Sequence, residues 1–245
     1  MPTPRAVLEC GLSEKFFNED EDPIELSLLP GLDDDGVIKL ESELGTRLPP
    51  ELDELVRYAR GFEFGPIDTM AFDAGFSFGM EKILPRVVPL CGDGFGNFWV
   101  VEVQKSGAWG PVFFANHDPP VLVVQAKDMT TFIDEVLSLG RQDRTSAVDE
   151  VHDGASMRIW RDEPWGKRAA DLHGSPDATV CQFIEQLNAD DLVFDLREQV
   201  IGSGFAWGRN GPEANMKRCG DELLFALVMP PKRPSLFKRM FGKSG

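Results

Sequence analysis

The chain has 245 residues, of which 42% are hydrophobic, so it can bury a substantial core in one large domain or two modest ones. Its formal net charge is −16, which disfavours a nucleic-acid partner because the phosphate backbone would be repelled. A basic protein partner fits this charge better, although acidity also serves solubility alone. No run approaches the roughly 20 apolar residues that span a bilayer, and no signal peptide pattern is present. We therefore expect a cytoplasmic protein without a transmembrane segment.

The cysteines and histidines form no metal-ligand pattern. The four cysteines are far apart and include no CxxC pair, which indicates reduced thiols. The three histidines lie in different segments, and none has a second ligand at helix or hairpin spacing. We therefore predict no metal site and no cofactor. The histidines are His117, His152 and His173.

The amino-terminal part predicts an irregular segment followed by a helix. Residues 1–29 mix acidic and apolar residues without a clear period, which fits a strand or a tether. The stretch of residues 29–45 places Val37, Leu40 and Leu44 on one face of a short helix, and Asp33 to Asp35 supply a capping carboxylate near its start. A calcium loop of the EF-hand type is not favoured, because that loop needs acids at alternate positions.

Residues 48–61 predict a second helix, with Pro50 in its first turn and Gly61 at its end. Between residues 62 and 90, short apolar runs broken by glycine and proline favour strands and their connections. Three clearer strands follow, rich in β-branched and aromatic residues, and the short links between them predict antiparallel pairing. These strands span residues 97–103, 110–118 and 121–126.

A helix over residues 127–140 then closes the sheet, with Asp128 as its cap. Beyond a polar stretch, a helix with Ser175 as cap and Pro176 in its first position, together with two strands, predicts a smaller α+β module. This part could also be an extension that docks onto the first sheet. The predicted division is an amino-terminal segment 1–29, a main domain 30–140, a linker 141–158, a small α+β module 159–231 and a basic tail 232–245.

The tail combines five positive charges with interleaved apolar residues and contains no acid. This pattern fits a short amphipathic helix that touches a membrane, or a tail without fixed structure. Its basic residues are Lys232, Arg233, Lys238, Arg239 and Lys243.

Two motifs resemble active-site chemistry, and both are better explained as turns. Gly92, Gly94 and Gly96 suggest a nucleotide loop, but they lead into a strand, whereas a phosphate-binding loop leads into a helix. His117 and Asp118 suggest a general base, but neighbours in an extended segment point to opposite faces and no activated nucleophile is nearby. We therefore predict no catalytic residue.

A glycine-rich stretch over residues 202–212 surrounds Phe205 and Trp207 and ends beside Arg209. If it is exposed, it would be an aromatic and cationic anchor of the kind that dominates interfaces. If it is buried, it is a turn that brings two aromatic rings to the core. The candidate partner-binding residues, taken from turns and acidic segments, are Asp33, Asp34, Asp35, Asp93, Trp109, Trp207 and Arg209.

Four segments, in this order, resemble the SUKH superfamily, which includes the yeast regulator of cell-wall glucan synthesis and many bacterial immunity proteins. They are LPPELDELVRYARGFEF, PLCGDGFGNFWVVEV, GPVFFANHDPP and AKDMTTFIDEVL, and they cover residues 30–138. The resemblance implies an α+β fold in which amino-terminal helices pack on a curved, mostly antiparallel sheet that a final helix closes. It also implies no enzyme activity.

Bacterial members that resemble this chain are commonly immunity proteins that neutralise a toxin, often a nuclease. A negative surface would then steer association with a basic toxin domain. We therefore expect a non-enzymatic protein-binding domain, most consistent with an immunity protein against a bacterial polymorphic toxin. The alternative is a regulatory or scaffold protein, for example of cell-wall synthesis.

Overall fold

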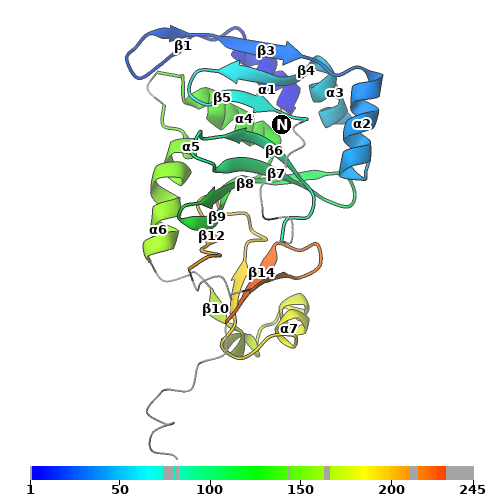
Figure 1. Cartoon of the computed structure of the whole chain (residues 1–245), viewed down its shortest axis with the longest axis vertical. Coiled ribbons are helices and arrows are strands. Elements are labelled where there is room, and N and C mark those ends of the chain that lie inside the picture. The colour runs from blue at the N-terminus through cyan, green and yellow to red at the C-terminus, as the bar shows by residue number, and fades with distance from the viewer. Residues whose placement is uncertain are drawn as a thin grey trace, which may run out of the picture.

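The chain folds into an α+β arrangement in which helices flank antiparallel sheets (Figure 1). This confirms the predicted fold class. Among the described helices, none has both the length and the apolar character that a bilayer crossing requires. The computed structural model describes residues 2–73, 80, 83–142, 144–162, 166–209 and 215–229.

The first 30 residues contain a helix that the sequence did not predict. Helix α1 (Pro4–Gly11) begins where the Thr3 hydroxyl accepts a hydrogen bond from the Ala6 amide at 3.2 Å, with Pro4 in the first turn. It buries Leu8 against the main core. Three short strands follow it, which agrees with the strand alternative for this segment. They are β1 (Phe16–Phe17), β2 (Pro23–Ile24) and β3 (Leu26–Pro30).

Helix α2 (Asp34–Leu44) forms where the apolar spacing predicts it. The Asp33 carboxylate accepts a hydrogen bond from the Gly36 amide at 2.9 Å and so caps the helix. Gly45 ends it with a φ of 69°, a left-handed conformation that glycine adopts without strain. The capping interpretation of this aspartate run is therefore confirmed for Asp33.

Helix α3 (Pro50–Tyr58) is shorter than predicted. Its expected end at Gly61 is wrong, because strand β4 (Ala59–Phe64) begins directly after Tyr58 and pairs with strands on both of its sides. Gly61 lies inside β4 with a φ of 157°, and a β-carbon there would stand 2.1 Å from the Met70 carbonyl oxygen. Glycine is therefore needed for close strand approach, and it does not end the helix.

Two antiparallel sheets lie side by side in Figure 1, the smaller at the top and the larger below it. The smaller has the order β3-β4-β5, and the larger has the order β12-β9-β8-β7-β6. Within the described residues, β5 and β6 are neighbours that no ladder of backbone hydrogen bonds joins, so a seam separates the two sheets. The strands are β5 (Asp68–Ala71), β6 (Val87–Gly92), β7 (Phe98–Val103), β8 (Trp109–His117) and β9 (Pro120–Ala126).

The larger sheet is covered on both faces, which explains the unbroken apolar runs in its strands. In β8, Phe114 packs into the core beneath the amino-terminal helices, whereas Phe113 packs into a second core on the opposite face. Helix α4 (Met129–Ser138) closes the first of these cores, as predicted. Asp128 caps it by accepting a hydrogen bond from the Thr131 amide at 2.7 Å.

Much of the stretch predicted as a linker is helical. Helix α5 (Ala147–Asp149), the π-helix η1 (Glu150–Ala155) and helix α6 (Ser156–Arg161) follow one another without a break. On their inner face, apolar side chains at helical spacing are buried in the core that also covers one face of the larger sheet. The members of this stripe are Val148, Val151, Ala155 and Ile159. The domain division itself stays a prediction.

The carboxy-terminal part forms a small sheet of its own, with the order β10-β11-β14-β13. The two strands predicted there are confirmed as β11 (Leu192–Asp195) and β14 (Leu224–Val228). The helix is also present, as α7 (Ala178–Ile184), but its cap is Asp177 and the predicted cap, Ser175, is wrong. The remaining elements are β10 (Lys167–Arg168), the 3-10 helix η2 (Ala169–Leu172) and β13 (Asn215–Arg218).

A short strand, β12 (Gly204–Phe205), joins this carboxy-terminal part to the larger sheet by pairing with β9. The Phe205 ring lies 5.0 Å from the Phe194 ring and 5.2 Å from the Phe225 ring, so an aromatic row fills the second core. In Figure 1 the small sheet lies at the end of the molecule beyond β12. Of the two alternatives for this part of the chain, a separate small module or an extension docked onto the first sheet, these contacts support the docked extension.

Candidate functional site

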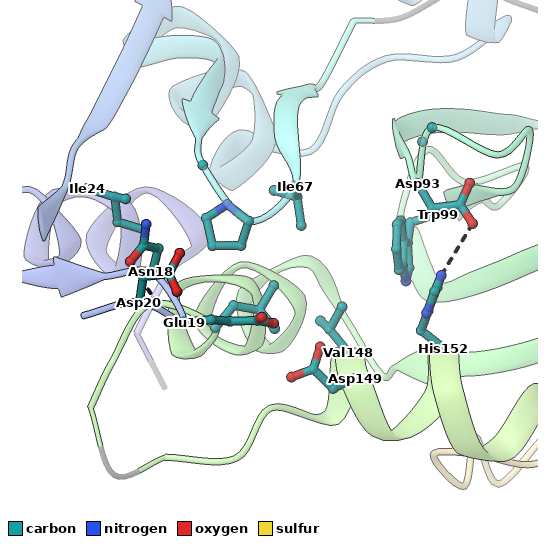
Figure 2. A pocket seen from close by; sticks show the side chains of 15 residues that line it. Asn18, Glu19, Asp20, Ile24, Ile67, Asp93, Trp99, Val148, Asp149 and His152 are labelled. Atoms are coloured by element: carbon teal, nitrogen blue, oxygen red, sulfur yellow. Dashed lines mark hydrogen bonds and ion pairs between the residues drawn. The ribbon is translucent and has the colours of Figure 1, made fainter. Parts of the chain in front are cut away.

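A cleft of about 780 Å³ opens where five segments far apart in the sequence meet (Figure 2). These are the β1–β2, β4–β5 and β6–β7 turns with the strand ends beside them, the carboxy-terminal end of α4 and the α5–η1 helix. Carboxylates and apolar side chains line it, and none of the described lining residues is Lys or Arg. We call it the acidic cleft. Its acids are Glu19, Asp20, Asp93 and Asp149, and its main apolar residues are Ile24, Ile67, Trp99, Leu139 and Val148.

The β1–β2 turn holds two of these acids over the opening. The Asn18 side-chain oxygen accepts hydrogen bonds from the amides of Asp20 at 3.0 Å and Asp22 at 2.8 Å. Glu21 adopts a φ of 64°, which completes the tight reversal. The backbone of the turn is therefore organised by Asn18, which leaves the Glu19 and Asp20 carboxylates to face the cleft.

The β6–β7 turn, residues 92–97, is organised by the Asp93 carboxylate, whose side chain is only 5% exposed. It accepts hydrogen bonds from the Phe95 amide at 2.8 Å, from the Asn97 amide at 3.1 Å and from Asn97 Nδ2 at 2.5 Å. Burial alone would raise the pKa of Asp93, but these bonds and His152 outweigh it and lower the pKa below its ordinary value. Asp93 is therefore a buried anion that holds the turn.

The predicted turn roles for the glycines and for the His117–Asp118 pair agree with this geometry. Gly94 and Gly96 have φ values of 79° and 90°, which favour glycine strongly. The Asn97 side-chain oxygen accepts a hydrogen bond from the His117 amide at 2.9 Å and also contacts its Nδ1 at 2.9 Å. The two turns thus support each other, and the glycines lead into β7 and not into a helix.

The same turn presents an aromatic side chain to solvent. Phe95 is 80% exposed, the largest exposure among the described large hydrophobic residues that lie on the surface. Its backbone amide is held by Asp93, so the ring projects from a fixed turn beside the acidic cleft. An exposed aromatic ring on a rigid turn is typical of a binding anchor.

Trp99 forms part of the cleft wall and is fixed at its polar end. Its indole Nε1 donates a hydrogen bond to Gln125 Oε1 at 2.9 Å, and Gln125 Nε2 donates to the Ala147 carbonyl at 3.0 Å. Gln125 is fully buried, so this chain of bonds connects the sheet to the start of α5 inside the core.

The π-helix η1 brings His152 onto this wall. The imidazole lies 5.9 Å from the Trp99 ring in a stacked arrangement and 5.2 Å from the Phe114 ring. Its Nε2 lies 3.3 Å from Asp93 Oδ2, and its Nδ1 lies 2.6 Å from Asp153 Oδ1. Figure 2 shows His152 reaching from η1 toward Asp93. His152 therefore connects the helix to the β6–β7 turn.

This constellation favours binding over chemistry. Both ring nitrogens of His152 face carboxylates, and the Asp93 oxygens are occupied by the turn. None of the described lining residues is Ser, Thr or Cys, so the wall offers no hydroxyl or thiol nucleophile. The cleft offers several carboxylates around an apolar wall. This arrangement suits a basic peptide segment that also carries apolar side chains.

Asp149 is a cleft acid whose ionised form is disfavoured by its surroundings. Partial burial raises the pKa of Asp149 above its ordinary value, the charge of Asp153 raises it further, and Glu19 adds to this effect across the cleft, while His152 opposes it. A bound cation would relieve this repulsion between like charges.

The structure separates the predicted partner-binding residues. Asp93 is the one that lines the acidic cleft. Asp33, Asp34 and Asp35 lie at the start of α2, on the opposite side of Figure 1 from α5, and Asp34 pairs with Arg57 at 2.7 Å. These three aspartates therefore do not share a surface with Asp93.

The aromatic and cationic candidates serve other contacts. The indole nitrogens of Trp109 and Trp207 are buried, and no hydrogen-bond partner within the described residues reaches them. Arg209 donates from Nη1 to the Asp162 carbonyl at 2.5 Å and from Nη2 to the Ile159 carbonyl at 3.2 Å, which satisfies the end of α6. Residues 210–212 of the glycine-rich stretch lie outside the described part of the chain.

Several residues in the cleft, and Phe95 beside it, were not identified from the sequence. Glu19 and Asp20 belong to an acidic run that reads as a loop, and only folding brings that loop over Trp99. Phe95 carried a usable signal, since an aromatic residue between glycines in a turn is exposed more often than one in a strand. His152 and Asp149 carried none, because their positions depend on the helical stretch α5–η1, which the sequence predicted as part of a linker.

The chain is thus an α+β protein with an open antiparallel sheet and an acidic cleft at the seam of its two central sheets. Residues 31–135 match the model of the SMI1 / KNR4 family (SUKH-1), so this part of the chain is a SUKH domain, as its sequence suggested. Domains of this kind are in general immunity-like or regulatory binding modules and not enzymes. Searches of curated proteins and of solved structures found no match for the chain.

Proposed function

We propose that the protein is a non-enzymatic, cytoplasmic immunity protein that binds a basic toxin domain over the acidic cleft. The observation that carries this proposal is the lining of the cleft, in which four carboxylates surround an apolar wall without a neighbouring Lys or Arg among the described residues. A basic segment with apolar side chains would satisfy both features at once. The match to the SUKH-1 family supports a binding role of this class.

The overall charge supports the same partner class. A formal charge of −16 attracts a basic domain over long range and accelerates the encounter at low salt. A nuclease toxin, whose own surface attracts phosphate, fits this potential. We therefore expect the association rate to fall steeply as ionic strength rises.

The first test is co-expression with the toxins that are encoded beside the gene. We expect one of them to be neutralised, and a variant with Glu19→Gln, Asp20→Asn and Asp149→Asn to lose protection while remaining folded. A matched control, Glu43→Gln with Glu185→Gln and Glu198→Gln, removes the same charge from exposed positions outside the cleft and should keep protection. If no neighbouring toxin binds, or if both triple variants protect equally, the proposal is lost.

Phe95 provides a second and more local test. Because Phe95 is 80% exposed, Phe95→Ala should change the free energy of unfolding by less than about 0.5 kcal/mol. If Phe95 is a binding anchor, the same change should weaken partner affinity by about 2 kcal/mol or more, roughly thirtyfold. Isothermal titration with the neutralised toxin measures this, with the exposed Ile38→Ala as control. Equal losses for both variants would contradict an anchor at Phe95.

A regulatory or scaffold role is the second candidate. The observation that favours it is that residues 136–245 lie outside the family match, yet the sheet that they form packs against the larger sheet through β12 and the aromatic row and offers a further surface. Under this proposal the basic tail contacts a membrane or an acidic protein. Removing residues 232–245 would then change localisation or the set of bound partners, and no change would argue against this role.

A further inference from the structure

We infer that the protein forms a two-fold symmetric dimer in which the helical stretch of residues 147–161 packs antiparallel against the same stretch of a second copy. The feature that points to this is a self-complementary pattern of charges on the outer side of that stretch. A dimer of this kind requires no toxin and does not use the acidic cleft, so it goes beyond the proposed function.

The helical stretch turns one face to the core and the other to solvent. Helix α5, η1 and α6 run through residues 147–161 without a break, a length of about 20 Å. The apolar stripe from Val148 to Ile159 faces the core, and in Figure 1 the stretch runs along the left edge of the molecule. We call its opposite side the outer helix face. The exposed or half-exposed residues of this face are Glu150, Asp153, Gly154, Met157, Arg158 and Arg161.

The charges of the outer helix face are separated by sign. Both acids, Glu150 and Asp153, lie in the first half of the stretch, and both bases, Arg158 and Arg161, lie in the second half. Each acid lies as many residues before the junction of η1 and α6 as one of the bases lies after it. The π-helix rises less per residue than the α-helix, and the long Arg side chains can span the small offset that results.

A two-fold axis at this junction therefore joins opposite charges. It places Glu150 opposite Arg161 of the second copy, and Asp153 opposite Arg158 of the second copy. Because the axis is two-fold, each of these contacts occurs twice. A parallel arrangement of the same two helices would instead set acid against acid and base against base.

These charges are largely unsatisfied within their own chain. Among the ion pairs of the described residues, none involves Glu150, Arg158 or Arg161. Asp153 contacts His152 and still has a side chain that is 78% exposed. The helix dipole alone favours acids at the start of a helix and bases at its end, but it does not require them to be equally spaced about the middle.

A glycine in the middle of the outer helix face supports a close contact there. A β-carbon at Gly154 would meet no atom within 4 Å, and its φ lies outside the left-handed region, so neither space nor backbone conformation requires glycine. Glycine inside a helix lowers its stability. The proposed axis places Met157 of the second copy over Gly154, where the missing side chain lets the helices approach and the flexible Met fills the space.

The dimer is expected to be weak. A single pair of short helices falls at the low end of interface sizes, which is typical of transient contacts. The net charge of −16 also opposes self-association, although at physiological ionic strength repulsion beyond about 8 Å is largely screened. We therefore expect a dissociation constant on the order of 0.1 mM.

Sedimentation equilibrium of the full chain, over a concentration series that brackets this value, tests the dimer. The basic variant carries Glu150→Arg with Asp153→Arg, and the acidic variant carries Arg158→Glu with Arg161→Glu. Each variant alone should self-associate at least about tenfold more weakly than the wild-type chain, because like charges then face each other. An equimolar mixture of the two should associate at least as tightly as the wild type, because every antiparallel contact again joins opposite charges.

The basic variant separates this contact from a general effect of charge. Its net charge is less negative than that of the wild-type chain, so weaker overall repulsion would strengthen its self-association, whereas the proposed contact predicts a loss. Matched controls place the same charge changes at exposed positions elsewhere and should leave the dissociation constant within about twofold of the wild type. They are Glu43→Arg with Glu185→Arg, and Lys15→Glu with Lys127→Glu.

Gly154→Gln provides a test that changes no charge and does not threaten the fold. Because glutamine favours the helix more than glycine does, this variant should have a melting temperature at least as high as that of the wild-type chain. Its side chain would occupy the space of the close contact, so the dimer should be at least about tenfold weaker. Circular dichroism confirms that each variant is folded.

Four outcomes would overturn the inference. The first is a wild-type chain that stays monomeric over the whole concentration series. The second is a loss of association that the matched controls reproduce, or that neither charge variant shows. The third is a mixture of the two folded charge variants that associates no better than either one alone. The fourth is a Gly154→Gln protein that associates as tightly as the wild type.

Discussion

Asp93 is the residue on which the shape of the acidic cleft depends most directly. Its carboxylate accepts hydrogen bonds from both backbone and side-chain donors of the β6–β7 turn and lies beside His152 of η1. The Asp93 side chain is only 5% exposed, so its carboxylate has lost most of its contact with water. The hydrogen-bond donors of the turn replace that water. The sequence predicted a turn and a partner-binding aspartate there; the structure adds that Asp93 acts by positioning its neighbours.

Changing Asp93 to Ala should lower the free energy of unfolding by about 1–3 kcal/mol at pH 7, because buried turn amides lose their acceptor. The pKa of Asp93 is below the ordinary value, so the contribution of its charge is complete above the unfolded-state pKa of about 3.9 and is lost as the pH falls through the lower folded-state pKa. The difference in free energy of unfolding between the wild-type chain and the Asp93→Ala variant should therefore be constant from pH 7 to about pH 5. It should become smaller in stronger acid.

Urea denaturation over a pH series measures this, and Glu198→Ala, at an exposed turn position, should stay within about 0.5 kcal/mol of the wild-type chain. An Asp93→Ala protein as stable as the wild type at pH 7 would show that the turn does not need the carboxylate.

At the scale of elements, one buried ion pair ties the carboxy-terminal hairpin to the larger sheet. Arg218 of β13 pairs with Glu102 of β7, and each side chain is 7% exposed. The Arg218 guanidinium also donates to the Ile83 carbonyl at 3.1 Å and lies 5.4 Å from the centre of the Phe225 ring. Burial raises the pKa of Glu102, and the hydrogen bond and charge of Arg218 oppose that rise.

Replacing Arg218 with Met should cost about 3–5 kcal/mol of stability at pH 7, because the Glu102 carboxylate is left buried without its cation. The pKa of Glu102 should then rise further. A carboxyl whose folded-state pKa is raised destabilises the fold above that pKa, so the deficit should shrink as the pH falls through it.

Denaturation at several pH values checks this expectation, and adding Glu102→Gln to the Arg218→Met protein should recover part of the loss. A deficit below about 1 kcal/mol at neutral pH would mean that the aromatic contacts alone hold the hairpin in place.

At the scale of the whole molecule, the two faces of the larger sheet depend on different ends of the chain. One face packs under the amino-terminal helices, and the other meets the carboxy-terminal aromatic row. A chain that ends at residue 140, the predicted boundary of the main domain, would leave Phe113, Leu122 and Val124 uncovered and the β9 edge unpaired. A sheet with an exposed apolar face and a free edge tends to associate.

We therefore expect the 1–140 fragment not to unfold cooperatively and to bind a hydrophobic dye. Each uncovered large apolar side chain costs about 1.5–3 kcal/mol, and three of them approach the total stability of about 5–15 kcal/mol that a domain of this size has. Calorimetry and dye fluorescence measure both properties, with the full chain as reference. A soluble fragment with a sharp unfolding transition would instead support an independent domain that ends near residue 140.

The sequence by itself determined the local structure and the family. Helices α2 and α4 follow from apolar spacing and capping aspartates, and α3 follows from apolar spacing and the proline in its first turn. Strands β7 to β9 follow from their composition, because all these signals act between residues that are close in the chain. It could not predict the end of α3, since Ala59 joins a strand only when partners lie on both sides. The polar stretch of residues 141–158 was likewise predicted as a linker, because its short apolar stripe becomes significant only when a core is present for it to pack against.

The acidic cleft belongs to the tertiary structure alone. Its acids come from three segments, Glu19 and Asp20 from the β1–β2 turn, Asp93 from the β6–β7 turn and Asp149 from α5, and no periodicity relates them. Charge and composition predicted an acidic binding protein, because such totals do not depend on the fold. Where the charges gather does depend on it, since packing decides which distant carboxylates lie around one cleft and which remain far apart on the surface.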